Sequence, residues 1–156
     1  MFRAMQQAEF DDWQRLFIDD YAEDMRANSG YSDELARQRA QKSLDDYLPQ
    51  GLDSSRQVLL SIEIAQQLVG YLWYQRDGNS IYINDFILLP EFRGLGYGKQ
   101  AIGELEELLQ KQGVEEIRLR VAADNLRAKG LYESCQFKVT GYNMSLMLKN
   151  KLTQPG

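Results

Sequence analysis

The segment with the clearest chemical potential is the glycine-rich stretch at residues 88–99, LLPEFRGLGYGK. Gly94, Gly96 and Gly98 permit a tight turn, because glycine has no Cβ to clash with the backbone. A helix begins directly after them, so its free N–H groups and dipole favour a bound anion. Arg93 adds a fixed positive charge. The segment therefore predicts a cradle for a diphosphate.

Three phosphate-binding patterns compete for this stretch. The P-loop pattern fails, because Arg93 and Gln100 stand where it needs glycine and serine or threonine. A relaxed Rossmann pattern, GxGxxA, fits from Gly96 to Ala101, which leaves an NAD(P)-binding oxidoreductase as one alternative. The predicted strands at residues 57–64, 68–74 and 81–88 precede the loop, however, whereas that fingerprint follows the first strand of its domain. The pattern [RQ]xxGx[GA] is satisfied by Arg93, Gly96 and Gly98.

The composition excludes several other mechanisms. The 156 residues contain no histidine, which excludes a Ser-His-Asp triad, a Cys-His pair and an HExxH zinc site. Cys135 is the single cysteine, so neither an internal disulfide nor a cysteine-clustered metal site is expected, and no metal is predicted. The net charge of −5 disfavours nucleic acid and anionic membranes as partners. With no apolar leader or membrane-length run, we expect a cytoplasmic protein.

The negative charge is concentrated in the first third of the chain. Residues 1–50 hold 11 acidic and 6 basic residues, whereas residues 51–156 hold 12 of each. Such a surface favours a cationic partner, although ordinary solvated helix faces explain it equally well.

Hydrophobic periodicity predicts one mixed α/β domain with the element order β-α-α-β-β-β-α-β-α-β. Apolar spacings of three and four predict helices at residues 9–28, 33–47, 97–109 and 125–135. Alternating and β-branched runs predict strands at residues 1–5, 57–64, 68–74, 81–88, 116–122 and 137–148, the last as a strand or hairpin. These elements predict a single domain at residues 1–152, followed by a frayed C-terminal tail at residues 153–156.

A second motif follows the glycine loop at residues 125–137. In the pattern NxxAxxxYxxxGF the chain matches at Asn125, Ala128, Tyr132 and Phe137 and departs at Gln136, where glycine is usual. With the loop, this motif resembles the GCN5-related N-acetyltransferase (GNAT) superfamily, and in particular a bacterial subgroup of it. The resemblance implies a central mixed, mostly antiparallel twisted sheet flanked by helices.

The resemblance also implies acetyl-CoA as co-substrate. The strand before the loop would separate from its parallel neighbour. Its backbone at Phe86, Ile87 and Leu88 would form hydrogen bonds with the pantetheine arm of the cofactor. The Leu88 N–H would polarise the thioester carbonyl. Asn125 would hydrogen-bond the cofactor, or simply cap its helix. The diphosphate and cofactor arm would be held by Arg93, Gly94, Leu95, Gly96, Tyr97, Gly98, Lys99 and Ala128.

Two residues are the candidate catalysts. Tyr132 matches the family tyrosine that protonates the departing thiolate, and a phenol is protonated at pH 7. Asp85 precedes the pantetheine positions and is our candidate base for the amine, the alternative being a structural carboxylate. Glu63, a further acid within a predicted strand, is expected to face solvent.

Several functions remain open on the sequence alone. The leading prediction is direct acetyl transfer to a primary amine, on a small molecule or peptide, by a monomer or homodimer. A catalytically silent acyl-CoA-binding domain and a transferase of longer acyl groups are the alternatives on the same fold. Arg127 and Lys129 could meet the cofactor phosphate, although a solvated helix face is the simpler explanation, and Cys135 is expected to be a buried filler.

Overall fold

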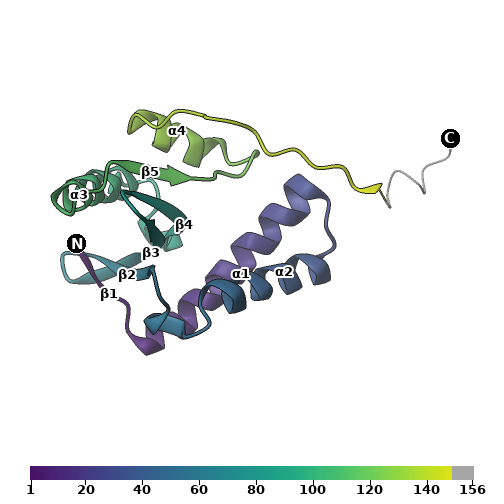
Figure 1. The fold of residues 1–156 in the computed structure, drawn as a ribbon, viewed down its shortest axis with the longest axis horizontal. Helices are drawn as coiled ribbons and strands as arrows, with labels where there is room; N and C mark the ends of the chain where they lie inside the picture. Colours follow the sequence, from purple (N-terminus) through teal and green to yellow (C-terminus); the bar gives the residue numbers. More distant parts are fainter. Residues whose placement is uncertain (149–156) are drawn as a thin grey trace.

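The computed structural model describes residues 1–148. Its five strands are β1 (Phe2–Ala4), β2 (Gln57–Ile64), β3 (Gln67–Asp77), β4 (Ser80–Leu88) and β5 (Glu116–Leu119). Its four α-helices are α1 (Gln7–Ser29), α2 (Asp33–Tyr47), α3 (Tyr97–Lys111) and α4 (Leu126–Ser134). Single 3₁₀ turns lie at Gly51–Asp53 and Pro90–Phe92. Figure 1 shows α1 and α2 on one side of the sheet and α3 on the other.

The strands form one mixed sheet in the order β1-β2-β3-β4-β5. The first four are antiparallel to their neighbours, and only β4 and β5 run parallel. The predicted mixed, mostly antiparallel α/β fold is therefore confirmed. The Rossmann alternative fails on this topology, because the glycine loop follows antiparallel strands instead of opening a parallel βαβ unit.

Each face of the sheet carries its own hydrophobic core. Alternate residues of β3 point to opposite faces, so Tyr71 and Trp73 pack beneath α1 and α2 while Leu72 packs beneath α3. Trp13 is fully buried on the first face, with its ring 5.5 Å from that of Trp73. Residues of α1, α2, β2 and β3 thus hold one aromatic cluster rigidly in place.

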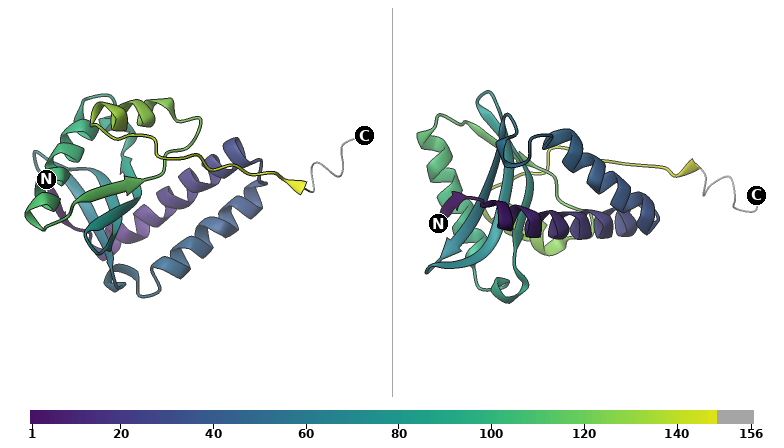
Figure 2. Two further views of the ribbon diagram at one scale, coloured as in Figure 1. Left: turned by 45° about the horizontal axis from the view of Figure 1, so that its top comes forward. Right: turned by 90° about the horizontal axis from the view of Figure 1, so that it is seen from below.

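Two predictions about strands need correction. We expected residues 116–122 to be extended, but β5 stops at Leu119, because it pairs with β4 only as far as Ile83. We also expected a last strand at residues 137–148. The part of that segment up to residue 147 forms no strand, because it runs away from the sheet and meets no neighbouring strand (Figure 2).

The remaining expectations concern the ends of the chain and the membrane. No helix within residues 1–148 is both long and apolar enough to span a bilayer. The predicted domain end at residue 152 and the tail at 153–156 lie outside the described residues.

Candidate active site

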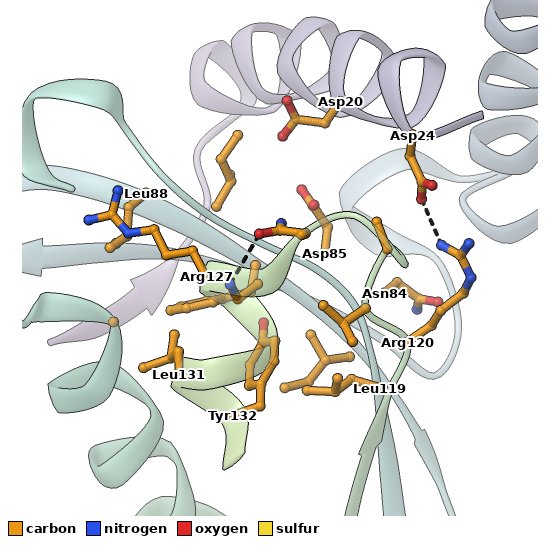
Figure 3. A pocket seen from close by; sticks show the side chains of 18 of the residues that line it. Asp20, Asp24, Asn84, Asp85, Leu88, Leu119, Arg120, Arg127, Leu131 and Tyr132 are labelled. Carbon is orange, nitrogen blue, oxygen red and sulfur yellow. Dashed lines mark hydrogen bonds and ion pairs between the residues drawn. The ribbon is translucent and has the colours of Figure 1, made fainter. Parts of the chain in front are cut away.

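A cavity of about 1020 Å³ opens where β4 and β5 separate (Figure 3). Pairing between these strands runs from Ser80 and Glu116 to Ile83 and Leu119, while β4 continues to Leu88. Asn84 has no partner on β3, and this bulge marks the point where the two parallel strands part. The predicted splay is therefore present, and α1, α4 and the glycine loop close the cavity around it.

The end of β4 presents backbone groups to the gap. Phe86, Ile87 and Leu88 all line the cavity, as predicted. The Leu89 N–H donates to the Val69 carbonyl of β3 at 2.8 Å. Because hydrogen-bonded pairs alternate along an antiparallel ladder, the Leu88 N–H points away from β3 and into the gap. It can therefore serve as a hydrogen-bond donor to a ligand lying there.

The glycine loop has the geometry of an anion cradle. Gly94 and Gly96 take φ values of 75° and 84°, a region that other residues rarely enter, and Gly96 is the N-cap of α3. No side chain caps this helix. The first-turn N–H groups, from Tyr97 to Lys99, precede the first intrahelical donor, Gln100, which bonds to Gly96 at 3.2 Å. These groups are available to bind an anion.

Positive side chains surround this cradle. Arg93, Lys99 and Arg127 line the cavity, and the Arg127 guanidinium lies so close to Gly94 that a Cβ there would come within 2.9 Å of it. Arg93 Nε also donates to the Leu88 carbonyl at 2.9 Å, which ties the loop to β4. The three cations can neutralise a phosphorylated ligand.

The other predicted loop residues divide into two groups. Gly98 lines the cavity and packs against Leu131 of α4. Leu95 is exposed and Tyr97 packs its ring 6.4 Å from that of Phe92, and neither side chain lines the cavity. Any contact that Leu95 or Tyr97 makes with a ligand in this cavity would therefore come from the backbone.

Helix α4 begins and ends with recognisable caps. At its start the Asn125 Oδ1 accepts a hydrogen bond from the Ala128 N–H at 3.1 Å, so the capping interpretation of Asn125 is confirmed. Asn125 and Ala128 also line the cavity, which keeps a role in ligand binding open to test.

The end of α4 explains the tolerated departure from the motif. Gln136 adopts φ 74°, the left-handed conformation that glycine usually fills at this position. The Phe137 N–H donates to the Tyr132 carbonyl and the Gln136 N–H to that of Glu133, both at 3.0 Å, which is a Schellman motif. The Phe137 ring lies 5.5 Å from that of Tyr132. This turn therefore helps to orient the candidate acid.

Tyr132 lines the cavity and its hydroxyl is directed toward the side where Asp85 lies (Figure 3). Burial raises the pKa of this phenol well above its ordinary range, and the negative charge of Asp85 raises it further. Tyr132 is consequently protonated at neutral pH and can donate a proton.

Asp85 is held in the cavity wall by a buried tryptophan. The Trp13 indole donates to the Asp85 carboxylate, with 2.8 Å between Nε1 and Oδ2. Burial raises the pKa of Asp85 to about 7, and this rise is opposed by the Trp13 hydrogen bond and enhanced by the charge of Asp20. A carboxylate with a pKa near neutrality is suited to take up and release protons.

Two residues of this arrangement were not predicted. Trp13 positions Asp85, and Asp20 lines the cavity from α1, where burial raises the pKa of its carboxyl group. A signal for Asp20 exists in the sequence: it lies three residues after Phe17 and seven after Trp13, so it falls within the apolar stripe of the helix.

Several other charged residues form ion pairs within the protein. Glu63 forms an ion pair with Arg3, and Lys129 pairs with Glu133 at 3.2 Å. Asp24 lines the cavity, but its carboxylate lies 2.6 Å from the Arg120 guanidinium. Its charge is therefore largely neutralised within the protein.

Comparison with known proteins defines the class to which this fold and cavity belong. Residues 5–137 match the model of the acetyltransferase (GNAT) family. The chain therefore belongs to this family and is an acyltransferase. The resemblance proposed from the two motifs is confirmed.

The similarity to individual proteins extends over nearly the whole chain. The chain is 31% identical to the uncharacterized N-acetyltransferase YycN of Bacillus subtilis, over 95% of this chain and 98% of YycN. The crystal structure of YycN has a TM-score of 0.89, covering 94% of this chain and 97% of that one. PaiA N-acetyltransferase from Thermoplasma acidophilum, in complex with coenzyme A, shares the fold at 20% identity and a TM-score of 0.65 over 92% of each chain. Spermidine N-acetyltransferase from Vibrio cholerae, in complex with CoA and spermine, shares it at 19% and 0.64, over 90% and 82% of the chains.

Proposed function

We propose that this protein transfers the acetyl group of acetyl-CoA directly to a primary, cationic amine within a ternary complex. The observation that carries the proposal is the pairing of two groups in one cavity. Asp85 has a pKa of about 7 and Tyr132 is protonated, and both lie beside the anion cradle of α3. One group is suited to accept a proton and the other to donate one.

The co-substrate supplies an activated thioester, and the cradle fits its phosphates. The first-turn N–H groups of α3 would hold the diphosphate, with Arg93, Lys99 and Arg127 neutralising its charge. Two proteins that share the fold have been crystallised with coenzyme A. The gap between β4 and β5 leads from this cradle to Asp85 and Tyr132, as a pantetheine arm would require.

Asp85 is the proposed base. An alkylammonium group must lose a proton before its nitrogen can attack a carbonyl carbon. The Asp85 carboxylate would accept that proton while Trp13 keeps one of its oxygens fixed. As the new C–N bond forms, the Leu88 N–H would donate to the developing oxyanion.

Tyr132 is the proposed acid. When the C–S bond breaks, its hydroxyl would protonate the departing thiolate. The nitrogen, which then carries one proton more than a neutral amide holds, would return that surplus proton to the phenolate, and Asp85 would release the first proton to solvent. The negative charge of Asp85 raises the pKa of Tyr132. Protonation of Asp85 removes that charge, so proton uptake by the base makes the acid a better donor.

The acceptor side is acidic. Asp20 and Glu23 line the cavity from α1, and Asp85 faces them from the sheet. Burial makes the ionised form of the Asp20 carboxyl group less favourable. A positively charged ligand beside Asp20 would offset that free-energy cost. A polyamine, a lysine side chain or an amino sugar fits this requirement. One protein of the same fold is named for spermidine acetylation.

Thermal unfolding with acetyl-CoA, coenzyme A or NAD tests the co-substrate. A ligand at about 100 times its Kd stabilises the folded protein by roughly 2.7 kcal/mol. We expect both CoA species, but not NAD, to raise the unfolding temperature. Arg127→Gln should reduce the shift, and the matched substitution Lys129→Gln on the same helix should not. No shift with either CoA species would contradict the proposal.

Release of the CoA thiol in the presence of spermidine, lysine or glucosamine tests the transfer. Tyr132→Phe should lower kcat by about 10²-fold or more while acetyl-CoA still binds. Asp20→Asn should raise KM for a cationic amine, whereas Asp19→Asn, which removes a carboxylate that faces away and pairs with Arg37, should not. CoA binding without release of thiol by any amine would favour a silent acyl-CoA-binding domain.

A further inference from the structure

An arginine with unused hydrogen-bond donors lies on the acceptor side of the cavity. Arg120 directly follows Leu119, the last residue of β5 that pairs with β4, and it lines the cavity (Figure 3). Its Nη1 group donates to the Asp24 carboxylate, with 2.6 Å between Nη1 and Oδ2. The Arg120 side chain makes no other hydrogen bond within residues 1–148. Because a guanidinium carries five N–H donors, most of those on Arg120 remain available to a ligand.

Asp24 fixes the position of this guanidinium. Its second carboxylate oxygen, Oδ1, accepts a hydrogen bond from the Asn28 Nδ2 at 2.9 Å, so both oxygens of Asp24 are already bonded. The same Asn28 amide also donates to Asp124, in the segment between β5 and α4. The Asp24 side chain is 19% exposed and the Arg120 side chain 38%. Asp24 therefore orients Arg120 while part of the guanidinium stays accessible.

A second guanidinium adds positive charge on this side. Tyr21 lines the cavity from α1, and burial raises the pKa of its hydroxyl. The charges of Arg39 and Arg120 both oppose that rise, so both guanidinium groups lie close enough to act on Tyr21. Arg39 lies over the ring of Tyr31, 4.8 Å from its centre, and it forms no ion pair with any residue that the structure describes. Its positive charge therefore adds to that of Arg120.

The unpaired carboxylates lie at the reacting end of the cavity. Asp20 and Asp24 are four residues apart, so they project from one face of α1 about 6 Å apart along the helix axis. Burial and the charge of Asp20 raise the pKa of Asp85 to about 7, which indicates that these two carboxyl groups lie near each other. Glu23, which also lines the cavity, projects about 100° away from Asp24 around the helix. The cavity thus presents carboxylates beside the candidate base and guanidinium groups one helical turn further along.

We propose that the amine acceptor also carries a carboxylate, which Arg120 binds while the amine lies at Asp85. This inference rests on the transfer reaction proposed above, and it narrows the acceptor from cationic amines in general to small aminocarboxylates, of which lysine is an example. A guanidinium binds a carboxylate through two parallel N–H donors, which also fixes the orientation of the ligand. A polyamine would instead bring a second positive charge toward Arg120, where like charges repel.

Matched ligands test the carboxylate. The pair ε-aminocaproate and ε-aminocaproamide have the same amine and chain length and differ in one negative charge. Their binding is measured by calorimetry, with and without saturating coenzyme A, and their acetylation by release of thiol from acetyl-CoA. We expect the aminocarboxylate to bind about tenfold more tightly than the amide, because its hydrogen bonds join two charged groups. Equal binding of the pair, or tighter binding of the amide or of cadaverine, would overturn the proposal.

Two substitutions separate binding from a structural role. Arg120→Gln should remove the preference for ε-aminocaproate over its amide. Asp24→Asn keeps an oxygen that can accept from Arg120, so it should retain the preference. Circular dichroism establishes that both variants fold, and the comparison of ligands on the native protein stands without them. A preference that survives Arg120→Gln, or that both variants lose equally, would overturn the proposal, since Arg120 would then serve only to join β5 to α1.

The two proposals fail in different ways. Absence of thiol release with every amine would contradict the transfer reaction, while calorimetry would still decide whether the cavity binds an aminocarboxylate. Transfer to ε-aminocaproamide and cadaverine at the same kcat/KM as to ε-aminocaproate would leave the transfer reaction in place and contradict the carboxylate site.

Discussion

The two walls of the cavity are built differently. The wall formed by α1 and the centre of the sheet is densely packed, and α1 buries Phe10, Trp13, Phe17 and Ala22. The opposite wall, formed by α4, has no fully buried side chain. It is positioned by its caps at Asn125 and Gln136 and by contacts such as that of Leu131 with Gly98.

This difference in packing matches the chemical roles that we propose for Asp85 and Tyr132. Burial raises the pKa of Asp85 to about 7, and the hydrogen bond from Trp13 limits that rise while it fixes one of the carboxylate oxygens. That environment must exist before a ligand arrives. The wall carrying Tyr132 can be completed by the co-substrate. We infer that the base is preorganised and that the acid side is ordered by binding.

Paired substitutions of leucine measure the contrast directly. Leu44 of α2 packs in the same core as the buried face of α1. Leu44→Ala removes a side chain that is 3% exposed and should lower the free energy of unfolding by about 2–5 kcal/mol. Leu131→Ala in α4 removes a half-buried side chain and should cost about 1 kcal/mol or less without ligand. Urea unfolding gives both values. Equal costs would mean that the two walls are packed alike.

Asp85→Asn should make the protein more stable while impairing it as an enzyme. The folded-state pKa of Asp85 is about 7, above the ordinary 3.8, so the carboxylate destabilises the fold increasingly as pH rises between these values. Asparagine can accept the Trp13 hydrogen bond without that charge. The stability gain of the variant should grow by on the order of 2 kcal/mol from pH 5 to pH 8. A gain that does not change with pH would show that Asp85 titrates normally.

Trp13→Phe tests how the packed wall sets that pKa. The indole hydrogen bond lowers the pKa of Asp85, so its loss should move the titration upward by roughly one pH unit. Carbon-13 NMR of the aspartate carboxyl groups can follow the change. Trp73→Phe is the matched control, because the Trp73 indole donates to Gln57 at 2.6 Å and not to Asp85. The same shift in both variants would assign the effect to packing alone.

Gln136→Gly should strengthen the loosely packed wall slightly. A left-handed residue other than glycine costs roughly 1–2 kcal/mol, and glycine loses part of that gain through its greater chain entropy. We therefore expect about 0.5–1 kcal/mol of added stability in thermal unfolding. Gln112→Gly, where φ is −92°, should bring no such gain. A loss at position 136 would mean that the side chain itself supports the turn.

Local patterns were sufficient to predict much of this architecture. Apolar spacing placed all four helices and the first five strands, because most of these elements have one face against a core. The spacing of Arg93, Gly96 and Gly98 and the motif from Asn125 to Phe137 predicted the loop and helix that the cavity brings together. Asp85 was identified as a candidate because few acids lie within strands.

The rest depended on tertiary structure. The hydrogen bond from Trp13 to Asp85 spans 72 positions, and no local pattern can reveal it. The same limit applies to the ion pair between Asp24 and Arg120, which lie 96 positions apart. Residues 137–148 do alternate like a strand, but whether a strand forms depends on a neighbour that the sequence does not specify.

The most direct test of the central claim is the pH dependence of kcat/KM for the native protein and Asp85→Asn with the same amine. Ionisation of the amine affects both proteins equally, so the ratio of their rates isolates Asp85. We predict that the ratio, native over variant, rises with pH through about 7 and then levels off at about 10²-fold or more. A ratio near one, or one that does not change with pH, would contradict the assignment of Asp85 as the base.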